Sequence, residues 1–239
     1  MSWYWILAGG LVIFGLTLYF TGTLRYAKSV ILIVQVSPYE QEGEGKGRIL
    51  ILGDSTGYGT GAGDGKESVA GRLGADFPQY KIINQSVNGD TIEDATKRTS
   101  NLAGEFDLIL IQLGANDIIQ KHTTQKILSD LKILLEKLAP KTDQIVMISA
   151  GNVGGAPAFK GDEVSEYLEL SIDFHTALEE FARGQSNFIY VSLFERPEVD
   201  PFVIEPDTYM AFDGLHPSSA GYGLWYKKLK PKIEPILNK

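Results

Sequence analysis

The stretch that decides the fold runs from Ile49 to Gly57 and reads Ile-Leu-Ile-Leu-Gly-Asp-Ser-Thr-Gly. Four apolar residues without polar alternation end at a glycine, which predicts a short strand buried on both faces of a sheet. Ser55 follows on the turn. Residues just beyond the carboxyl ends of the strands form the ligand-binding crevice of open α/β sheets, so Ser55 is a candidate functional residue. Serine, glycine and aspartate are also ordinary turn residues, and this stretch alone favours neither interpretation.

Strand-like and helix-like segments alternate along the chain after this stretch. Short apolar runs predict further strands at 80–83, 106–113, 144–149 and 188–191. Apolar residues at helical spacing predict helices at 66–77, 91–102, 123–138, 163–183 and 217–229. Strands that are separated by helices pair in parallel. We therefore expect an α/β domain in which a five-stranded parallel sheet lies between helices on both faces.

The composition argues against several classes of function. The 239 residues carry a formal net charge of −8, which disfavours sequence-independent binding to nucleic acid. The chain has no cysteine, so disulfides, thiol nucleophiles and cysteine-ligated metals are excluded. The three histidines, His122, His175 and His216, are too few and too scattered to predict a zinc site.

The residues before this domain predict a membrane anchor. Residues 3–20 carry no charged side chain and would span about 27 Å as a helix, close to the thickness of a bilayer's hydrocarbon core. Aromatic residues stand at both ends of the run, as at a membrane interface. A cleaved signal peptide is one alternative, but no Lys or Arg precedes the run and residues 21–25 make a poor cleavage site. A buried helix of a soluble protein is the other.

We expect three regions: a transmembrane helix at 1–25, a juxtamembrane segment and linker at 26–47, and a globular domain at 48–239. Within the second region, residues 29–36 are too short to span a membrane and are predicted as an interfacial segment or an added edge strand. No basic residue precedes the anchor, whereas four follow it closely: Arg25, Lys28, Lys46 and Arg48. The positive-inside rule therefore favours a single-pass protein whose globular domain faces the cytosol.

Side chains suited to nucleophilic catalysis stand in the loops of the predicted domain. A serine hydroxyl such as that of Ser55 is a weak nucleophile and needs a base, which His216 can supply. The imidazole needs an acceptor on its other nitrogen, and Asp213 lies three residues earlier on the same turn. A tetrahedral oxyanion needs preorganised donors, and the candidates are the amides of Ser55 and Gly89 and the side chain of Asn116. Glycine at 89 would keep a side chain away from the oxyanion.

These residues stand in motifs that resemble the blocks of the SGNH/GDSL hydrolase family, in the family's order, from about Arg48 to the end of the chain. The matching segments are Gly53-Asp54-Ser55, Gly89 in Asn88-Gly89-Asp90, Gly114-x-Asn116-Asp117 and Asp213-x-x-His216-Pro217. Thr56 stands where the family has its eponymous leucine.

The resemblance implies a flavodoxin-like α/β/α sandwich. It also implies Ser55 as nucleophile, His216 as base and Asp213 as the partner of the base. The amides of Ser55 and Gly89 and the side chain of Asn116 would form the oxyanion hole. No metal or organic cofactor is required.

Three other motifs fit the same glycine-rich region less well. Gly53-x-Ser55-x-Gly57 matches the nucleophile elbow of α/β-hydrolases, but in that fold several strands precede the elbow. A dinucleotide-binding fingerprint begins at Gly57, but Asn84 and Gln85 stand where an acidic ribose ligand belongs. Gly65-Lys66 is similar to part of a phosphate-binding loop, but Glu67 stands in place of its Ser or Thr.

We therefore expect a membrane-anchored serine esterase that cleaves a small-molecule or lipid ester through an acyl-enzyme on Ser55. The alternatives are an acyltransferase that uses the same residues and a non-catalytic protein that binds acylated ligands. His122 and His175 are expected to be structural, and Asp54 and Asp117 to position loops through bonds to the backbone. Residues 150–161 and 194–212 are predicted to line the cleft, with apolar side chains suited to an acyl chain: Phe159, Phe202, Val203, Ile204, Tyr209, Met210 and Phe212.

Overall fold

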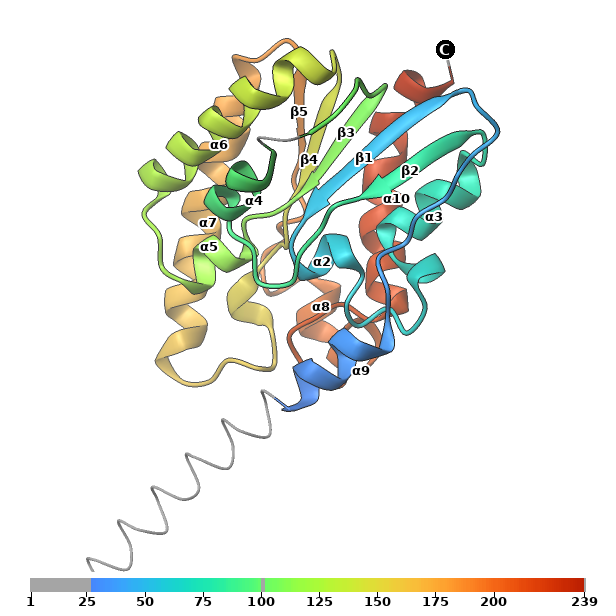
Figure 1. The fold of residues 1–239 in the computed structure, drawn as a ribbon. Helices are drawn as coiled ribbons and strands as arrows, with labels where there is room; N and C mark the ends of the chain where they lie inside the picture. Colours follow the sequence, from blue (N-terminus) through green and yellow to red (C-terminus); the bar gives the residue numbers. More distant parts are fainter. Residues whose placement is uncertain (1–26, 100–101, 239) are drawn as a thin grey trace, which may run out of the picture.

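The sheet is built from five short strands. In the computed structural model, which describes residues 27–99 and 102–238, these are β1 (Gly47–Gly53), β2 (Tyr80–Asn84), β3 (Leu108–Gln112), β4 (Ile145–Ile148) and β5 (Phe188–Val191). All neighbouring strands pair in parallel, in the order β2-β1-β3-β4-β5 (Figure 1). This is the strand order of flavodoxin-like sheets. The predicted five-stranded parallel sheet is therefore confirmed.

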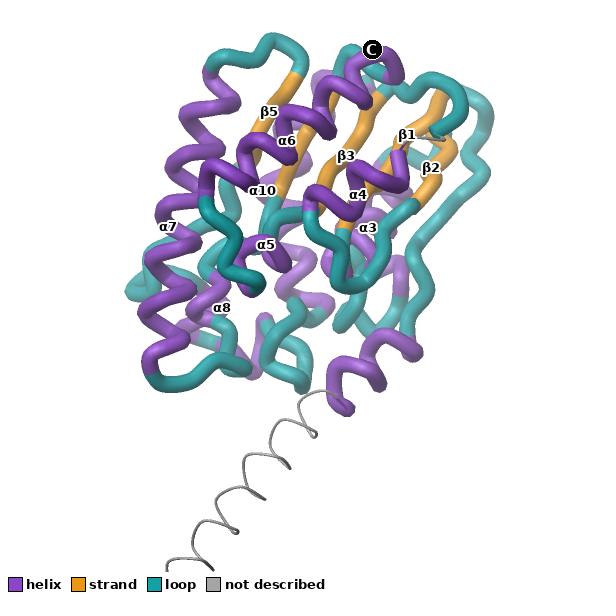
Figure 2. Tube along the Cα trace, turned by 60° about the vertical axis from the view of Figure 1, so that its left-hand side comes forward, coloured by secondary structure: helices purple, strands orange, loops and turns teal. Residues whose placement is uncertain are grey.

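Two groups of helices cover the two faces of the sheet (Figures 1 and 2). One face packs against α4 (Ile92–Arg98), α5 (Ala115–Ile119), α6 (Thr124–Leu138) and α7 (Asp162–Arg183), and the other against α3 (Val69–Asp76) and α10 (Ser219–Leu237). Alternate residues of β1 supply the two cores, with Leu50 and Leu52 on the first face and Ile49 and Ile51 on the second. Side chains of a strand alternate between faces, so an unbroken apolar run fits a sheet covered on both sides.

The short elements lie where the strands end. Figure 1 shows α2 (Ser55–Tyr58), α5, α8 (Pro201–Ile204) and α9 (Pro206–Tyr209) gathered beyond the carboxyl ends of the sheet. The described residues also form three single turns of 3-10 helix, at Gly65–Glu67, Ala139–Lys141 and Val153–Gly155. The strand order reverses between β1 and β3, and ligands of open α/β sheets bind at such a switch point. The fold thus places the residues after β1 and β3 at the expected crevice.

The last helix is longer than the sequence predicts. It was expected at 217–229 but runs from Ser219 to Leu237, through Pro231 and Pro235. A proline inside a helix costs about 3 kcal/mol because it lacks an N–H and clashes with the preceding turn. The extension buries Leu229, Ile233 and Leu237 completely, and each fully buried aliphatic side chain contributes about 1.5–3 kcal/mol. Burial of these three side chains offsets the cost of the prolines.

The chain before β1 packs on the domain. Residues 27–35 are helical, so the prediction of an added edge strand at 29–36 is wrong. Leu32 lies on this helix and Val36 directly follows its end. Both are buried against the body of the protein. The following segment, predicted as a linker, runs along the outer edge of β2, where Gln41 forms an antiparallel bridge with Ile82.

The predicted transmembrane anchor falls on residues 1–25, which lie outside the described residues. Within residues 27–99 and 102–238, no helix combines the length and the apolar character that crossing a membrane requires.

Candidate active site

Ser55 is held on a tight turn between β1 and α2. Asp54 caps α2 by accepting a hydrogen bond from the Thr56 amide at 2.7 Å and another from its hydroxyl at 2.8 Å. A Cβ at Gly57 would lie 2.5 Å from the Ser86 hydroxyl in the loop after β2, so only glycine permits this close approach. Ser55 is therefore the first residue of α2, on a turn that Asp54 and Gly57 shape, as the sequence predicts for Asp54.

The structure brings Ser55, His216 and Asp213 into one hydrogen-bonded series. His216 Nε2 lies 2.9 Å from Ser55 Oγ, and His216 Nδ1 lies 2.6 Å from Asp213 Oδ2. Asp213 Oδ1 also accepts hydrogen bonds from the backbone amides of Leu215 and His216, both at 3.0 Å. Asp213 and His216 are both buried. This is the arrangement in which an imidazole can take the serine proton while a carboxylate orients it.

The surroundings of Asp213 favour the ionised form of its carboxyl group, which can accept this hydrogen bond. Burial alone would raise the pKa of its carboxyl, but the hydrogen bond and the positive charge of His216, with the two backbone amides, lower this pKa to about 2. The carboxylate is therefore ionised at neutral pH. An ionised acceptor on Nδ1 favours the tautomer that leaves Nε2 free to accept the proton of Ser55.

Gly89 and Asn116 line the same cavity as Ser55 and His216. The Asn116 side chain donates one N–H to the carbonyl of Asp90 at 3.0 Å, which leaves its second N–H for a ligand. Among the described residues, neither the Ser55 nor the Gly89 amide has a hydrogen-bond acceptor. The residues that carry these three candidate donors thus line one cavity, and an oxyanion hole needs donors that lie together.

The backbone conformation gives a second reason for glycine at position 89. A Cβ built at Gly89 would meet no protein atom within 4 Å, but its φ of +87° lies in the left-handed region. That conformation is strained for any residue with a side chain. Backbone conformation, rather than crowding in the free protein, requires the glycine.

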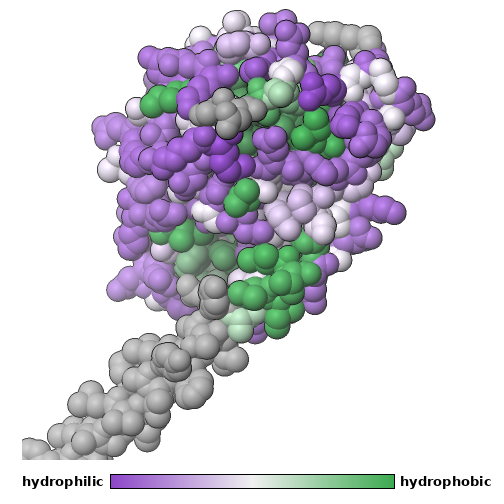
Figure 3. Space-filling model, viewed as in Figure 1, coloured by the Kyte–Doolittle hydropathy of each residue, from purple (hydrophilic) through white to green (hydrophobic). Residues whose placement is uncertain are grey.

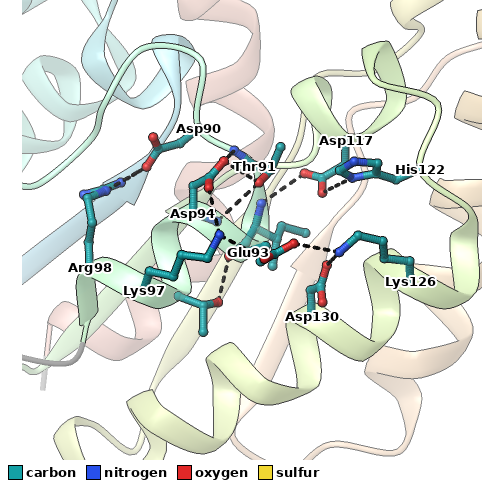
Figure 4. Close-up of polar contacts among 12 residues, drawn as sticks. Asp90, Thr91, Glu93, Asp94, Lys97, Arg98, Asp117, His122, Lys126 and Asp130 are labelled. Atoms are coloured by element: carbon teal, nitrogen blue, oxygen red, sulfur yellow. Dashed lines mark hydrogen bonds and ion pairs between the residues drawn. The ribbon is translucent and has the colours of Figure 1, made fainter.

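The loop that carries Gly89 is fixed by its own neighbours (Figure 4). The Asp90 carboxylate forms an ion pair with Arg98 of α4, and Arg98 Nη1 donates to the carbonyl of Gln85 at 2.6 Å. Asn116 holds the other side of the loop through the Asp90 carbonyl. The loop after β2 and the side chain of Asn116 are therefore positioned together.

The N-terminus of α4 is held by Thr91 and Asp117, which are drawn in Figure 4. Thr91 and Asp94 form a capping box, each side chain bonding to the other's amide. The buried Asp117 accepts a hydrogen bond from the Ile92 amide at 3.1 Å, so its predicted role in positioning a loop is confirmed. Thr91 is therefore the N-cap of α4.

A cavity of about 220 Å³ opens beside the Ser55 hydroxyl. Its walls are mostly apolar and come from segments far apart in the chain: Val153, Leu193, Phe202, Met210, Leu215 and Trp225. Of the apolar residues predicted to line the cleft, Phe202 and Met210 do so. Phe159 instead packs on Tyr167 in the core, and Ile204 and Phe212 are exposed.

Sequence reasoning missed Ser29 and Ile33, which come from the helix at residues 27–35 and also line the cavity. No motif marks them, because they stand in an apolar run whose place in the fold depends on contacts with distant residues.

The two remaining histidines are structural. His175 is buried in α7, where its Nε2 lies 3.0 Å from the carbonyls of Ala150 and Gly151. Burial lowers the pKa of His175 to about 4, so the ring is neutral. His122 Nδ1 contacts Asp117 Oδ1 at 3.3 Å. In the part of the chain that the structure describes, no three His, Asp or Glu side chains come together as a metal site would require.

The fold and the site together define a flavodoxin-like α/β/α protein with a Ser-His-Asp series at the switch point of its sheet. The model of the GDSL-like lipase/acylhydrolase family matches residues 51–224. The chain therefore belongs to this family of hydrolases, which act on ester bonds.

Several proteins of known identity are similar to the chain. An arylesterase of Vibrio mimicus is 27% identical over 195 residues, covering 79% of this chain and 88% of its own length. The esterase TesA of Pseudomonas aeruginosa is 22% identical over 199 residues, covering 79% and 89%. The crystal structure of a catalytic mutant of an acetylxylan esterase from Geobacillus stearothermophilus has the same fold. It superimposes with a TM-score of 0.61 at 17% identity, covering 81% of this chain and 96% of its own.

Proposed function

We propose that this protein is a serine esterase that hydrolyses a carboxylic ester through an acyl-enzyme on Ser55. The observation that carries the proposal is the series Ser55 Oγ, His216 and Asp213, which opens onto an apolar cavity beside Gly89 and Asn116. The esterases among the similar proteins support the same reaction.

The geometry supports a two-step mechanism. Ser55 Oγ attacks the ester carbonyl while its proton passes to His216 Nε2, and Asp213 stabilises the imidazolium. The carbonyl oxygen becomes an oxyanion that accepts hydrogen bonds from the amides of Ser55 and Gly89 and from Asn116. His216 then protonates the leaving alcohol, and the acyl group stays on Ser55. Water, activated by His216, attacks the acyl-enzyme and releases the acid.

The cavity favours a compact acyl group. Its volume of about 220 Å³ is below the roughly 300–1,000 Å³ typical of sites for drug-sized ligands. The apolar walls suit a short alkyl or aryl chain. The alcohol part would lie at the mouth, where the structure sets few limits.

The test is hydrolysis of a series of 4-nitrophenyl esters of increasing acyl length by the full-length chain and by Ser55→Ala. We expect turnover that is greatest for short acyl groups and at least about 10⁴-fold lower in Ser55→Ala. Turnover that survives in Ser55→Ala would show that the mechanism is wrong. If acyl transfer to an added alcohol exceeds transfer to water, the acyltransferase alternative is correct. Ligand binding without turnover would support a binding protein.

We also propose that residues 3–20 anchor the enzyme in a membrane, with the esterase domain on the cytosolic side. The uncharged sequence and the basic residues after it support this. So do three exposed apolar side chains on the helix at 27–35, Val30, Ile31 and Val34. Figure 3 shows an apolar region at the end of the molecule where this helix lies in Figure 1.

We expect the full-length chain to stay with membranes after an alkaline carbonate wash, whereas a peripheral protein is released. We also expect the domain to resist protease in intact cells and to be digested once the cells are opened. Digestion in intact cells would place the domain on the outer side.

A further inference from the structure

The helix at residues 27–35 forms one wall of the active-site cavity. Ser29 and Ile33, four residues apart and hence on one face of the helix, line the cavity. Leu32 on this helix and Val36 directly after its end are buried, with 4% and 5% of their surface exposed. The helix is thus fastened to the domain by one face and presents another to the site.

The helix at 27–35 also contacts Asp213, the partner of His216, directly. Ser29 Oγ donates a hydrogen bond to Asp213 Oδ2 at 2.9 Å. The same oxygen accepts the bond from His216 Nδ1, and Asp213 has no exposed side-chain surface. Among the described residues, the other donors to this carboxylate all belong to its own turn: His216 Nδ1 and the amides of Leu215 and His216. Ser29 is the donor that ties the carboxylate to a separate element of the fold.

We propose that Ser29 is a positioning residue for Asp213 and that the helix at 27–35 is part of the active site. This rests on the proposed function of the Ser55 site. Donors on the Asp213 turn move with that turn, so they cannot hold it against the rest of the protein. The Ser29 hydroxyl fixes the plane of the carboxylate from outside, and thereby the orientation of the imidazole. It also shares the negative charge of Oδ2 with His216.

Two consequences follow from the loss of this hydroxyl. The imidazole is held less firmly, and the rate falls. Hydrogen bonds to charged groups are among the stronger ones in proteins, so we expect a loss of at least about tenfold. In addition, Oδ2 then carries more charge toward the imidazolium, so the acidic limb of the pH–rate profile moves to higher pH.

The experiment measures the rate at which a fluorophosphonate labels Ser55 in the full-length chain, because this reaction needs an activated serine but no known substrate. Ser55 Oγ bonds to phosphorus, fluoride leaves, and the serine proton passes to His216. The variants are Ser29→Ala, Ser29→Thr, which keeps the hydroxyl, and Gln35→Ala as a control on the exposed side of the same helix. The labelling rates are measured from pH 5 to 9, with kcat and KM for the best ester.

We expect Ser29→Ala to lower the labelling rate and kcat at least about tenfold, with little change in KM and with the acidic limb at higher pH. Ser29→Thr should recover most of the rate, and Gln35→Ala should match the wild type. Equal rates in Ser29→Ala and wild type, or no recovery in Ser29→Thr, would overturn the proposal.

The failure of the two proposals can be told apart. Wild-type labelling without hydrolysis of any ester would overturn the esterase function and leave the role of Ser29 to be judged on labelling. Ester hydrolysis that depends on Ser55 but not on Ser29 would overturn only the role of Ser29. No labelling of wild-type Ser55 would overturn both.

Discussion

At the scale of single residues, Asn116 shows how one side chain can serve structure and chemistry together. One N–H of its amide is bonded to the Asp90 carbonyl, and the other is available to the cavity. The first bond orients the amide before a substrate arrives. Preorganised donors of this kind stabilise an oxyanion without reorganisation at the moment of reaction.

We expect Asn116→Ala to lower kcat about 10²–10³-fold with a smaller effect on KM, because the donor acts mainly on the oxyanion. The measurement is steady-state kinetics on the best ester. Asn187→Ala is the matched control, because Asn187 stands directly before β5, at the amino end of that strand, whereas the site lies at the carboxyl ends. A rise in KM with kcat unchanged would show that Asn116 binds the ground state instead.

At the scale of elements, the short helices near the site depend on their caps, because most backbone N–H and C=O groups of so short a helix have no partner within it. The helix α4 has seven residues and begins at the capping box of Thr91 and Asp94. Its Arg98 pairs with Asp90 and so holds the loop that carries Gly89. The stability of this helix is therefore linked to the geometry of the candidate oxyanion hole.

We expect Thr91→Ala to lower the free energy of unfolding by about 1 kcal/mol, the usual cost of losing an N-cap side chain. Thr91→Ser keeps the hydroxyl and should lie close to the wild type. Urea unfolding followed by circular dichroism measures both. A wild-type midpoint for Thr91→Ala would mean that the Asp117 bond to the Ile92 amide holds the helix start by itself.

At the scale of the whole molecule, the buried Asp54 makes stability depend on pH. Burial raises the pKa of this carboxyl to about 6, although the bonds from Thr56 and the charge of His216 oppose the rise. Among the described residues its Oδ2 has no hydrogen-bond partner. The folded protein therefore binds a proton that the unfolded chain releases near its ordinary pKa of 3.8. The free energy of unfolding therefore falls as the pH rises from 3.8 to about 6.

We expect the free energy of unfolding to fall by up to about 3 kcal/mol between pH 4 and pH 7 through Asp54, at 1.36 kcal/mol for each pKa unit. Asp54→Asn should flatten this slope. Denaturant unfolding of both proteins across that range is the measurement. Asp213 acts in the opposite sense, since its pKa of about 2 gives stability that is lost only as pH falls below 4. Parallel slopes in wild type and Asp54→Asn would contradict the assignment to Asp54.

The amino-acid sequence determined the features that rest on local pattern. Short apolar runs predicted all five strands, and the runs of β1 and β3 end at a glycine. Asp213 and His216 lie three residues apart, so their contact is nearly a local property of one turn. The order of the motifs along the chain predicted which loops would meet, because parallel strands bring their carboxyl ends to one edge.

Only the tertiary structure decided the features that depend on distant contacts. The β-branched run at 29–36 has the composition of a strand, yet it is helical as far as residue 35, and Leu32 and Val36 pack on the domain. Local preference yields to burial in such cases. The contact of Ser29 with Asp213 joins residues 184 positions apart. No spacing rule predicts that contact, because it depends on how the completed fold places a helix against the finished site.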